Sequence, residues 1–78
     1  MPPGKLPPLK PKQVVAALEK AGFYIHHQKG CHARLFHHSK LDLRVTIPIH
    51  GKDLPPHFIK LRILKQARLS EEDFLALL

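Results

Sequence analysis

Apolar residues recur every three or four positions in two stretches of the chain, and at every second position in the stretch between them. The wider spacing predicts a first helix from about Pro11 to Ala21. Proline suits the first helical position, where its missing N–H costs nothing, and Gly22 suits the residue that closes a helix. The apolar stripe of this helix comprises Val14, Val15, Leu18 and Ala21.

Three short runs then predict β-strands, at Phe23 to Gln28, Cys31 to His38 and Leu43 to Ile49. The third run alternates most cleanly, and Pro48 indicates a strand end or an edge strand. Because the connections are short, we expect an antiparallel meander. In the second run, one face would carry Ala33 and Leu35, and the other His32, Arg34 and Phe36.

A second helix is predicted from about Pro56 to Ala67, and a short last helix begins at Ser70, whose side chain can cap it. Helices on either side of the strands can cover the apolar face of the sheet. The predicted fold class is therefore α+β, a two-layer sandwich with the topology of a double-stranded RNA-binding domain. The second helix would bury Ile59, Ile63, Leu64 and Ala67, with Lys60 interrupting this arc.

The chain of 78 residues predicts a single small domain, residues 11–78. Four of the eight prolines lie in residues 1–10, which we expect to form a flexible N-terminal arm. A single cysteine, Cys31, favours a reducing compartment. There is no apolar stretch of signal-peptide or membrane-span length, so we expect a cytoplasmic protein with no membrane partner.

Positive charge is concentrated in the middle of the chain. The net charge is +7, and the segment from Lys29 to Arg68 has only Asp42 and Asp53 as acids. This favours a polyanionic partner, either nucleic acid or an acidic protein, and less so a membrane surface. An ordinary solvated basic surface is the plainer alternative.

The stretch Lys29-Gly30-Cys31-His32 is the most informative for chemistry. A glycine turn at a strand start is a simple way to aim an imidazole, which exchanges protons near neutral pH. A Cys31 nucleophile would need a base, and the neighbouring histidine would point to the other strand face. We therefore expect Cys31 to serve only as a small turn residue.

Five segments carry a familiar pattern: Leu18 to Phe23, Lys29 to His32, Val45 to His50, Ile63 to Ala67 and Leu69 to Phe74. In this order they resemble the HicA (YcfA-like) family of toxins from toxin–antitoxin pairs. They extend over most of residues 11–78. Three departures from the family pattern stand out: Cys31 in place of a usual serine, Pro55-Pro56-His57-Phe58 in place of a Gly-Thr helix entry, and Arg68 in place of a glycine.

This resemblance implies an endoribonuclease that cleaves mRNA and is neutralised by a HicB-like antitoxin. The essential histidine of the family corresponds to His32. Such a histidine can remove the proton of a ribose 2′-OH while nearby cations stabilise the charged intermediate, so we expect no cofactor and no metal. The candidate RNA contacts are Lys29, Arg34, Lys52, Arg62 and Lys65, and the supporting turn is Gly30 and Cys31.

A second acid–base group is expected to protonate the leaving oxygen. His50 is the first candidate, with a simple turn histidine as an equal alternative, and His37 is a weaker one. The seven histidines also suggest zinc binding as an alternative, because imidazole is a common zinc ligand. However, adjacent histidines in a strand, such as His26 and His27, would point to opposite faces.

Two other functions fit the same pattern. One is a non-catalytic RNA-binding module of the same fold, which would bind RNA in a salt-dependent way without cutting it. The other is a small basic adaptor whose role is to bind an acidic protein.

Overall fold

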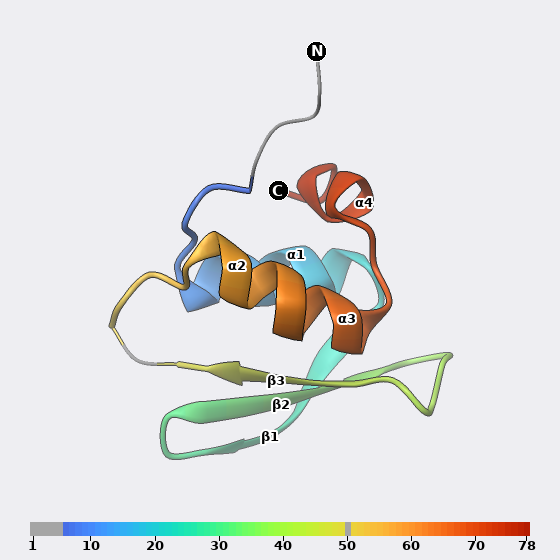
Figure 1. Cartoon of the computed structure of the whole chain (residues 1–78). Helices are drawn as coiled ribbons and strands as arrows, with labels where there is room; N and C mark the ends of the chain where they lie inside the picture. Colours follow the sequence, from blue (N-terminus) through green and yellow to red (C-terminus); the bar gives the residue numbers. More distant parts are fainter. Residues whose placement is uncertain (1–5, 50) are drawn as a thin grey trace.

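The structure is a computed structural model, and it describes residues 6–49 and 51–78. Three strands form one antiparallel sheet in the order β1-β2-β3, and the helices lie against one of its faces (Figure 1). The predicted α+β class is therefore confirmed, and each predicted element is present to within two residues. The elements are α1 (Pro11–Lys20), β1 (Phe23–Lys29), β2 (His32–His37), β3 (Arg44–Pro48), α2 (Pro56–Phe58), the π-helical turn η1 (Ile59–Ile63), α3 (Leu64–Ala67) and α4 (Glu71–Leu75).

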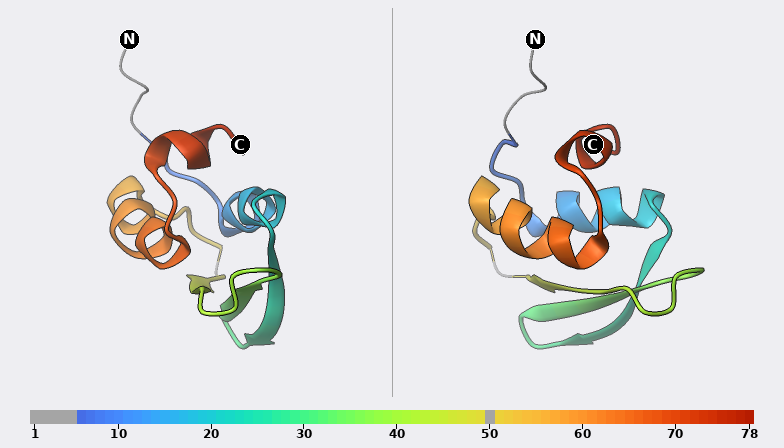
Figure 2. Two further views of the ribbon diagram at one scale, coloured as in Figure 1. Left: turned by 90° about the vertical axis from the view of Figure 1, so that its right-hand side faces the viewer. Right: turned by 45° about the vertical axis from the view of Figure 1, so that its right-hand side comes forward.

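Most of the core lies between the sheet and the helices, and it continues to α4 through Phe74. Figure 2 shows α1 and the continuous α2–η1–α3 helix side by side above the sheet, with α4 on the side of the helices that faces away from it. The alternation along β2 and β3 explains this layer, because every second side chain faces the helices. The fully buried side chains include Leu18, Leu35, Val45, Ile47, Ile59, Ile63 and Phe74.

The described part of the predicted N-terminal arm differs from a flexible segment. Leu6 and Leu9 are buried, because both pack into the hydrophobic core. Leu9 and Leu54 also exchange two backbone hydrogen bonds, with N···O distances of 3.2 and 2.7 Å. Leu6 and Leu9 lie on either side of Pro7 and Pro8. Prolines prevent this segment from forming a helix, but they do not prevent neighbouring apolar side chains from packing on the core. Residues 1–5 lie outside the described residues.

The second helix spans the predicted residues but contains a π-helical turn in its middle. The N–H of Leu64 donates to the carbonyl of Ile59, five residues back. With this wider turn, Ile59 and Ile63 are both fully buried while Lys60 is exposed. The lysine that interrupts the apolar arc thus reaches solvent, where its Nζ lies 3.4 Å from a carboxylate oxygen of Glu71.

Arg68 closes this helix in the left-handed conformation, with φ 56° and ψ 42°. Its N–H donates to the carbonyl of Lys65 (3.3 Å), and the N–H of Leu69 donates to that of Leu64 (3.0 Å). These two bonds form a Schellman motif, whose left-handed position usually holds glycine. The replacement of glycine by arginine noted in the sequence therefore falls where the backbone geometry favours glycine most.

Candidate active site on the open face of the sheet

The face of the sheet that points away from the helices carries three rows of side chains. Directly paired residues in an antiparallel sheet share a face, so the strand register defines these rows. Starting from the β1–β2 turn, they are Lys29, His32 and Pro48, then His27, Arg34 and Thr46, then Tyr24, Phe36 and Arg44.

His32 is the first residue of β2, the central strand, and its side chain is exposed. The two-residue turn before it places Gly30 at a φ of +58°, as a type II′ hairpin turn requires at its first position. Cys31 follows in the same turn, and its carbonyl accepts a hydrogen bond from the N–H of Ile49. The start of β2 is thereby tied to the end of β3, which fixes the backbone from which His32 projects.

Two shallow hollows meet at His32. The first, of about 380 Å³, lies on the sheet face and is lined by His27, Lys29, His32, Arg34 and Thr46. The second, of about 290 Å³, lies between β3 and the second helix and is lined by His32, Thr46, Pro48, Phe58, Arg62 and Gln66. One volume lies near the lower limit for small-molecule sites, about 300 Å³, and the other just below it.

A hydrogen bond joins the sheet to the helix beside the second hollow. The backbone N–H of Thr46 donates to Oε1 of Gln66 over 3.0 Å. β3 is an edge strand, as Pro48 suggested, and this bond satisfies one of its outward N–H groups. It also holds α3 against β3, and so helps to set where Arg62 lies relative to His32.

A β-bulge in β1 overturns the expectation that His26 and His27 point to opposite faces. Ile25 pairs with Leu35, and His27 pairs with the next residue, Arg34, so His26 is the extra residue. His26 stacks on Phe36 and His27 lines the hollow with His32, so both lie on the open face. Strict alternation fails here because the sequence contains no signal for the bulge.

His37 does not share the face of His32, so its weaker candidacy as a second acid–base group is wrong. Its Nε2–H donates to the carbonyl of Ala21 (2.9 Å), and its Nδ1 accepts from the N–H groups of Ser39 and Lys40 (both 3.0 Å). A Cβ at Gly22 would lie 2.7 Å from Nε2, so only glycine allows this approach. His37 is therefore a structural clamp between α1 and the end of β2.

The family model described as the HicA toxin of bacterial toxin–antitoxin systems matches residues 11–69. The chain belongs to the HicA toxin family. The matched region contains all three strands, the Gly30–Cys31 turn and His32, so the open face described above lies within the part that defines the family. A search of curated proteins finds no match.

The cations predicted to contact RNA do not all lie near His32. Lys29, Arg34 and Arg62 line the hollows at His32, whereas exposed Lys52 lies on the loop after β3 and lines neither. His50, the first candidate for a second acid–base group, lies outside the described residues.

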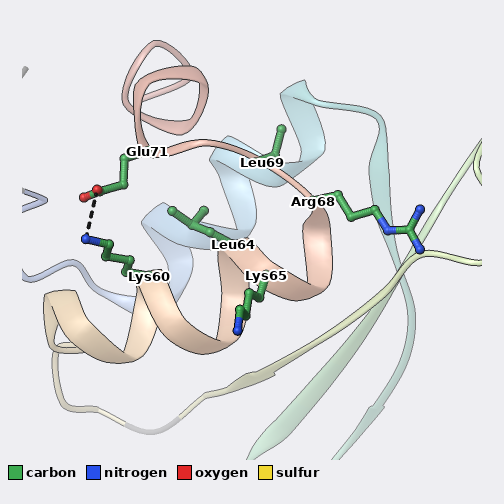
Figure 3. Close-up of a pocket in the computed structure, with 6 residues that line it drawn as sticks. All are labelled: Lys60, Leu64, Lys65, Arg68, Leu69 and Glu71. Atoms are coloured by element: carbon green, nitrogen blue, oxygen red, sulfur yellow. Dashed lines mark ion pairs between the residues drawn. The ribbon is translucent and has the colours of Figure 1, made fainter.

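Lys65 lies in a different hollow, between α3 and the start of α4 (Figure 3). Its neighbours there are Lys60, Leu64, Arg68, Leu69 and Glu71. Arg68 points out of this hollow toward the strands, where its Nη2 lies 3.6 Å from a carboxylate oxygen of Asp42. The second helix of this HicA family member therefore presents Arg62 and Lys65 to different hollows.

The three strands contain no aspartate or glutamate, while Lys29, Arg34 and Arg44 all face outward. The open face is thus a basic surface with histidines on it. Among the described residues, no three histidine, cysteine, aspartate or glutamate side chains lie where they could hold a metal ion. No described helix has the length and apolar character needed to cross a bilayer.

Proposed function

We propose that this HicA family member is an endoribonuclease that cleaves mRNA with His32 as the essential proton-transfer group. The observation that carries the proposal is the position of His32. It is an exposed imidazole at the junction of two hollows, with Lys29 and Arg34 in one and Arg62 in the other. Cations around a reacting phosphate stabilise the negative charge that develops in the transition state.

In the proposed reaction, His32 accepts the proton of a ribose 2′-OH, and the 2′-oxygen attacks the adjacent phosphorus. The bond from phosphorus to the 5′-oxygen breaks, and that oxygen takes a proton. The products are a 2′,3′-cyclic phosphate and a 5′-hydroxyl. The nucleophile comes from the RNA itself, so this scheme requires neither a metal ion nor a covalent enzyme intermediate.

His27 is a candidate for the group that protonates the 5′-oxygen. The bulge brings it to the same hollow as His32, together with Lys29 and Arg34, and β-bulges are common beside active sites. His50 remains the other candidate. A reaction that uses one histidine as base and another as acid slows at both low and high pH.

The proposed antitoxin is a HicB-like protein that covers the open face. This face carries Lys29, Arg34 and Arg44 with no strand carboxylate, so an acidic partner surface complements it. RNA and antitoxin would then compete for the same residues, and inhibition follows from occlusion of His32.

The test is cleavage of a single-stranded mRNA fragment in EDTA by the wild type, His32→Ala and His57→Ala. His57 is an exposed histidine on α2 that lines neither hollow, so it is a matched control. We expect His32→Ala to lose about 10²- to 10⁴-fold in rate and His57→Ala to cut normally. Equal cleavage by the wild type and His32→Ala would contradict the proposal, and binding without cutting by all three would favour a non-catalytic RNA-binding module.

A further pair of variants separates the two histidine candidates. In His27→Gln the rate should fall, and its decline at high pH should disappear because the protonated acid is no longer required. Lys29, His32 and Arg34, which line the same hollow, are unchanged in this variant. A pH profile with the wild-type shape would assign the acid to another group, with His50→Gln as the next variant.

A further inference from the structure

The third row of the open face belongs to a cluster of flat side chains that contains two stacked pairs of rings. The rings of His26 and Phe36 are stacked with centroids 4.1 Å apart and planes only 4° from parallel. The guanidinium carbon of Arg44 lies 5.1 Å from the centroid of the Phe36 ring. Beside them, Tyr24 stacks on His38 with centroids 4.5 Å apart. Three sequence segments thus contribute five planar groups to one surface patch, which we call the planar patch.

The planar patch is on the solvent side of the sheet, where no described helix covers it (Figure 1). Tyr24 and Phe36 are half-buried by their neighbours in the stack, and His26, His38 and Arg44 are exposed. Large aromatic rings at outward positions gain no burial against the core, which lies under the opposite face of the sheet. His26 and Arg44 lie against the Phe36 ring, so the exposed outer surfaces of His26, His38 and Arg44 are the part of the patch that an incoming planar group can contact.

The chemistry of the patch selects the partner. Aromatic side chains bind single-stranded nucleic acid because each base offers a π-face, and arginine adds charge and stacking to the same contact. Duplexes keep their bases stacked inside, so such a surface favours single strands. Positive charge on Lys29, Arg34 and Arg44, with no acid in the strands, complements a phosphate backbone.

Phe36 of the planar patch lies on the same strand as His32. Phe36 is four residues further along β2, so the two side chains are separated by about 13 Å at the usual rise of a strand. Arg34 and His27 occupy the row between them. A single strand that stacks its bases on the patch can pass over Arg34 and reach His32 with a phosphate a few nucleotides away.

We propose that Tyr24, His26, Phe36, His38 and Arg44 form a base-stacking subsite for single-stranded RNA. It holds nucleotides a few positions from the bond presented to His32. The link to His32 rests on the proposed ribonuclease function, whereas the stacking itself does not.

The test measures binding by the His32→Ala protein, which separates binding from cleavage. The probes are a labelled 12-nucleotide single-stranded RNA and the same RNA annealed to its complement. Phe36→Ala and His26→Ala are compared with Leu78→Ala, which removes an exposed apolar side chain from the C-terminal end of the chain, far from the sheet (Figure 1). We expect the first two to weaken single-strand binding by about 5- to 150-fold, and Leu78→Ala to leave it unchanged.

Tyr24 supplies a direct readout. It is the only tyrosine, and the chain has no tryptophan, so tyrosine fluorescence reports on the patch alone. Its lifetime should shorten when the single strand binds and stay constant with the duplex. Circular dichroism of each variant checks folding, and Phe36→Tyr, which keeps a ring, should retain most of the affinity if stacking is the cause.

Two results would overturn the proposal. One is unchanged single-strand affinity in folded Phe36→Ala and His26→Ala. The other is equal binding of single strand and duplex, which would leave only charge, or an antitoxin protein, as the reason for this surface. If the wild type fails to cut RNA but the stacking variants lose binding, the ribonuclease proposal fails and the subsite stands. If the wild type cuts RNA and the stacking variants bind normally, the stacking subsite fails and the ribonuclease proposal stands.

Discussion

The two faces of the same sheet differ in almost every respect, although their residues alternate along the same strands. On the inner face, Ala33, Leu35, Val45 and Ile47 are completely buried under the helices. On the open face, His32 and Arg34 are exposed, and stacked rings replace aliphatic packing. Because successive side chains of a strand point to opposite faces, one sheet carries the hydrophobic core on one side and the proposed RNA-binding residues on the other.

This separation has a consequence for mutations. A change on the inner face acts on the free energy of unfolding, because burial and packing are lost. A change on the open face should leave the free energy of unfolding nearly unchanged, because most exposed substitutions alter stability by less than about 0.5 kcal/mol. Under the proposed function, it should instead change the binding or cleavage of RNA. Neighbouring residues in one strand should therefore give opposite phenotypes.

Leu35 and its neighbour Arg34 lie on opposite faces of β2, and we expect the largest difference between the two faces here. Leu35→Ala should lower the free energy of unfolding by about 2–5 kcal/mol, a large part of the total for a small domain. Arg34→Ala should unfold like the wild type but bind single-stranded RNA more weakly, with a shallower salt dependence. Urea unfolding and RNA titrations at several salt concentrations measure the two effects, and a similar loss of stability in both variants would refute the division.

His37 and His38 are adjacent in the chain and show the same difference between a structural and an exposed side chain. His37 holds Ala21, Ser39 and Lys40 through three hydrogen bonds, whereas His38 is exposed and stacks on Tyr24. His37→Ala should cost about 1–3 kcal/mol, because the partly buried carbonyl of Ala21 loses its hydrogen-bond donor and the edge contact with the Phe23 ring is lost. His38→Ala should unfold within about 0.5 kcal/mol of the wild type. Equal unfolding midpoints in urea would show that the clamp is not a stabilising feature.

The smallest effect concerns Arg68, which lies at the helix exit and on neither face. Arg68→Gly removes the strain of a left-handed arginine, which is about 1–2 kcal/mol. Greater freedom of glycine in the unfolded chain and the lost surface contact with Asp42 offset part of this gain. We expect a net stabilisation of about 0.5 kcal/mol in urea unfolding, with Asp42→Ala to measure the ion pair alone. If Arg68→Gly were less stable than the wild type, the left-handed conformation of Arg68 would not be a source of strain.

The sequence was sufficient wherever a single local rule applied. Alternation placed Leu35 inward and His32 outward, and the Gly30 turn correctly marked the start of β2. It failed where tertiary contacts override local rules. The bulge at His26 changes the face of His27, and the proline-rich segment around Leu9 docks on Leu54.

The candidate site was predictable in part for the same reason. Strand alternation puts His32 and Arg34 on one face, and the structure places both at one hollow. Lys29, expected only as a turn residue that could supply charge, lines the same hollow. The planar patch depends on pairing between strands, since His26 meets Phe36 only through the register of β1 and β2. Arg62 and Lys65 looked equivalent along the helix, yet packing against β3 and α4 places them in separate hollows.

The central claim is that His32 activates the RNA's own 2′-OH on the open face. The most direct measurement is the chemistry of the RNA ends left by the purified protein in EDTA. We expect 2′,3′-cyclic phosphate and 5′-hydroxyl ends, and no cutting at a site whose nucleotide carries a single 2′-deoxy substitution. Ends with 3′-hydroxyl and 5′-phosphate groups, or cleavage that persists at the 2′-deoxy site, would contradict it.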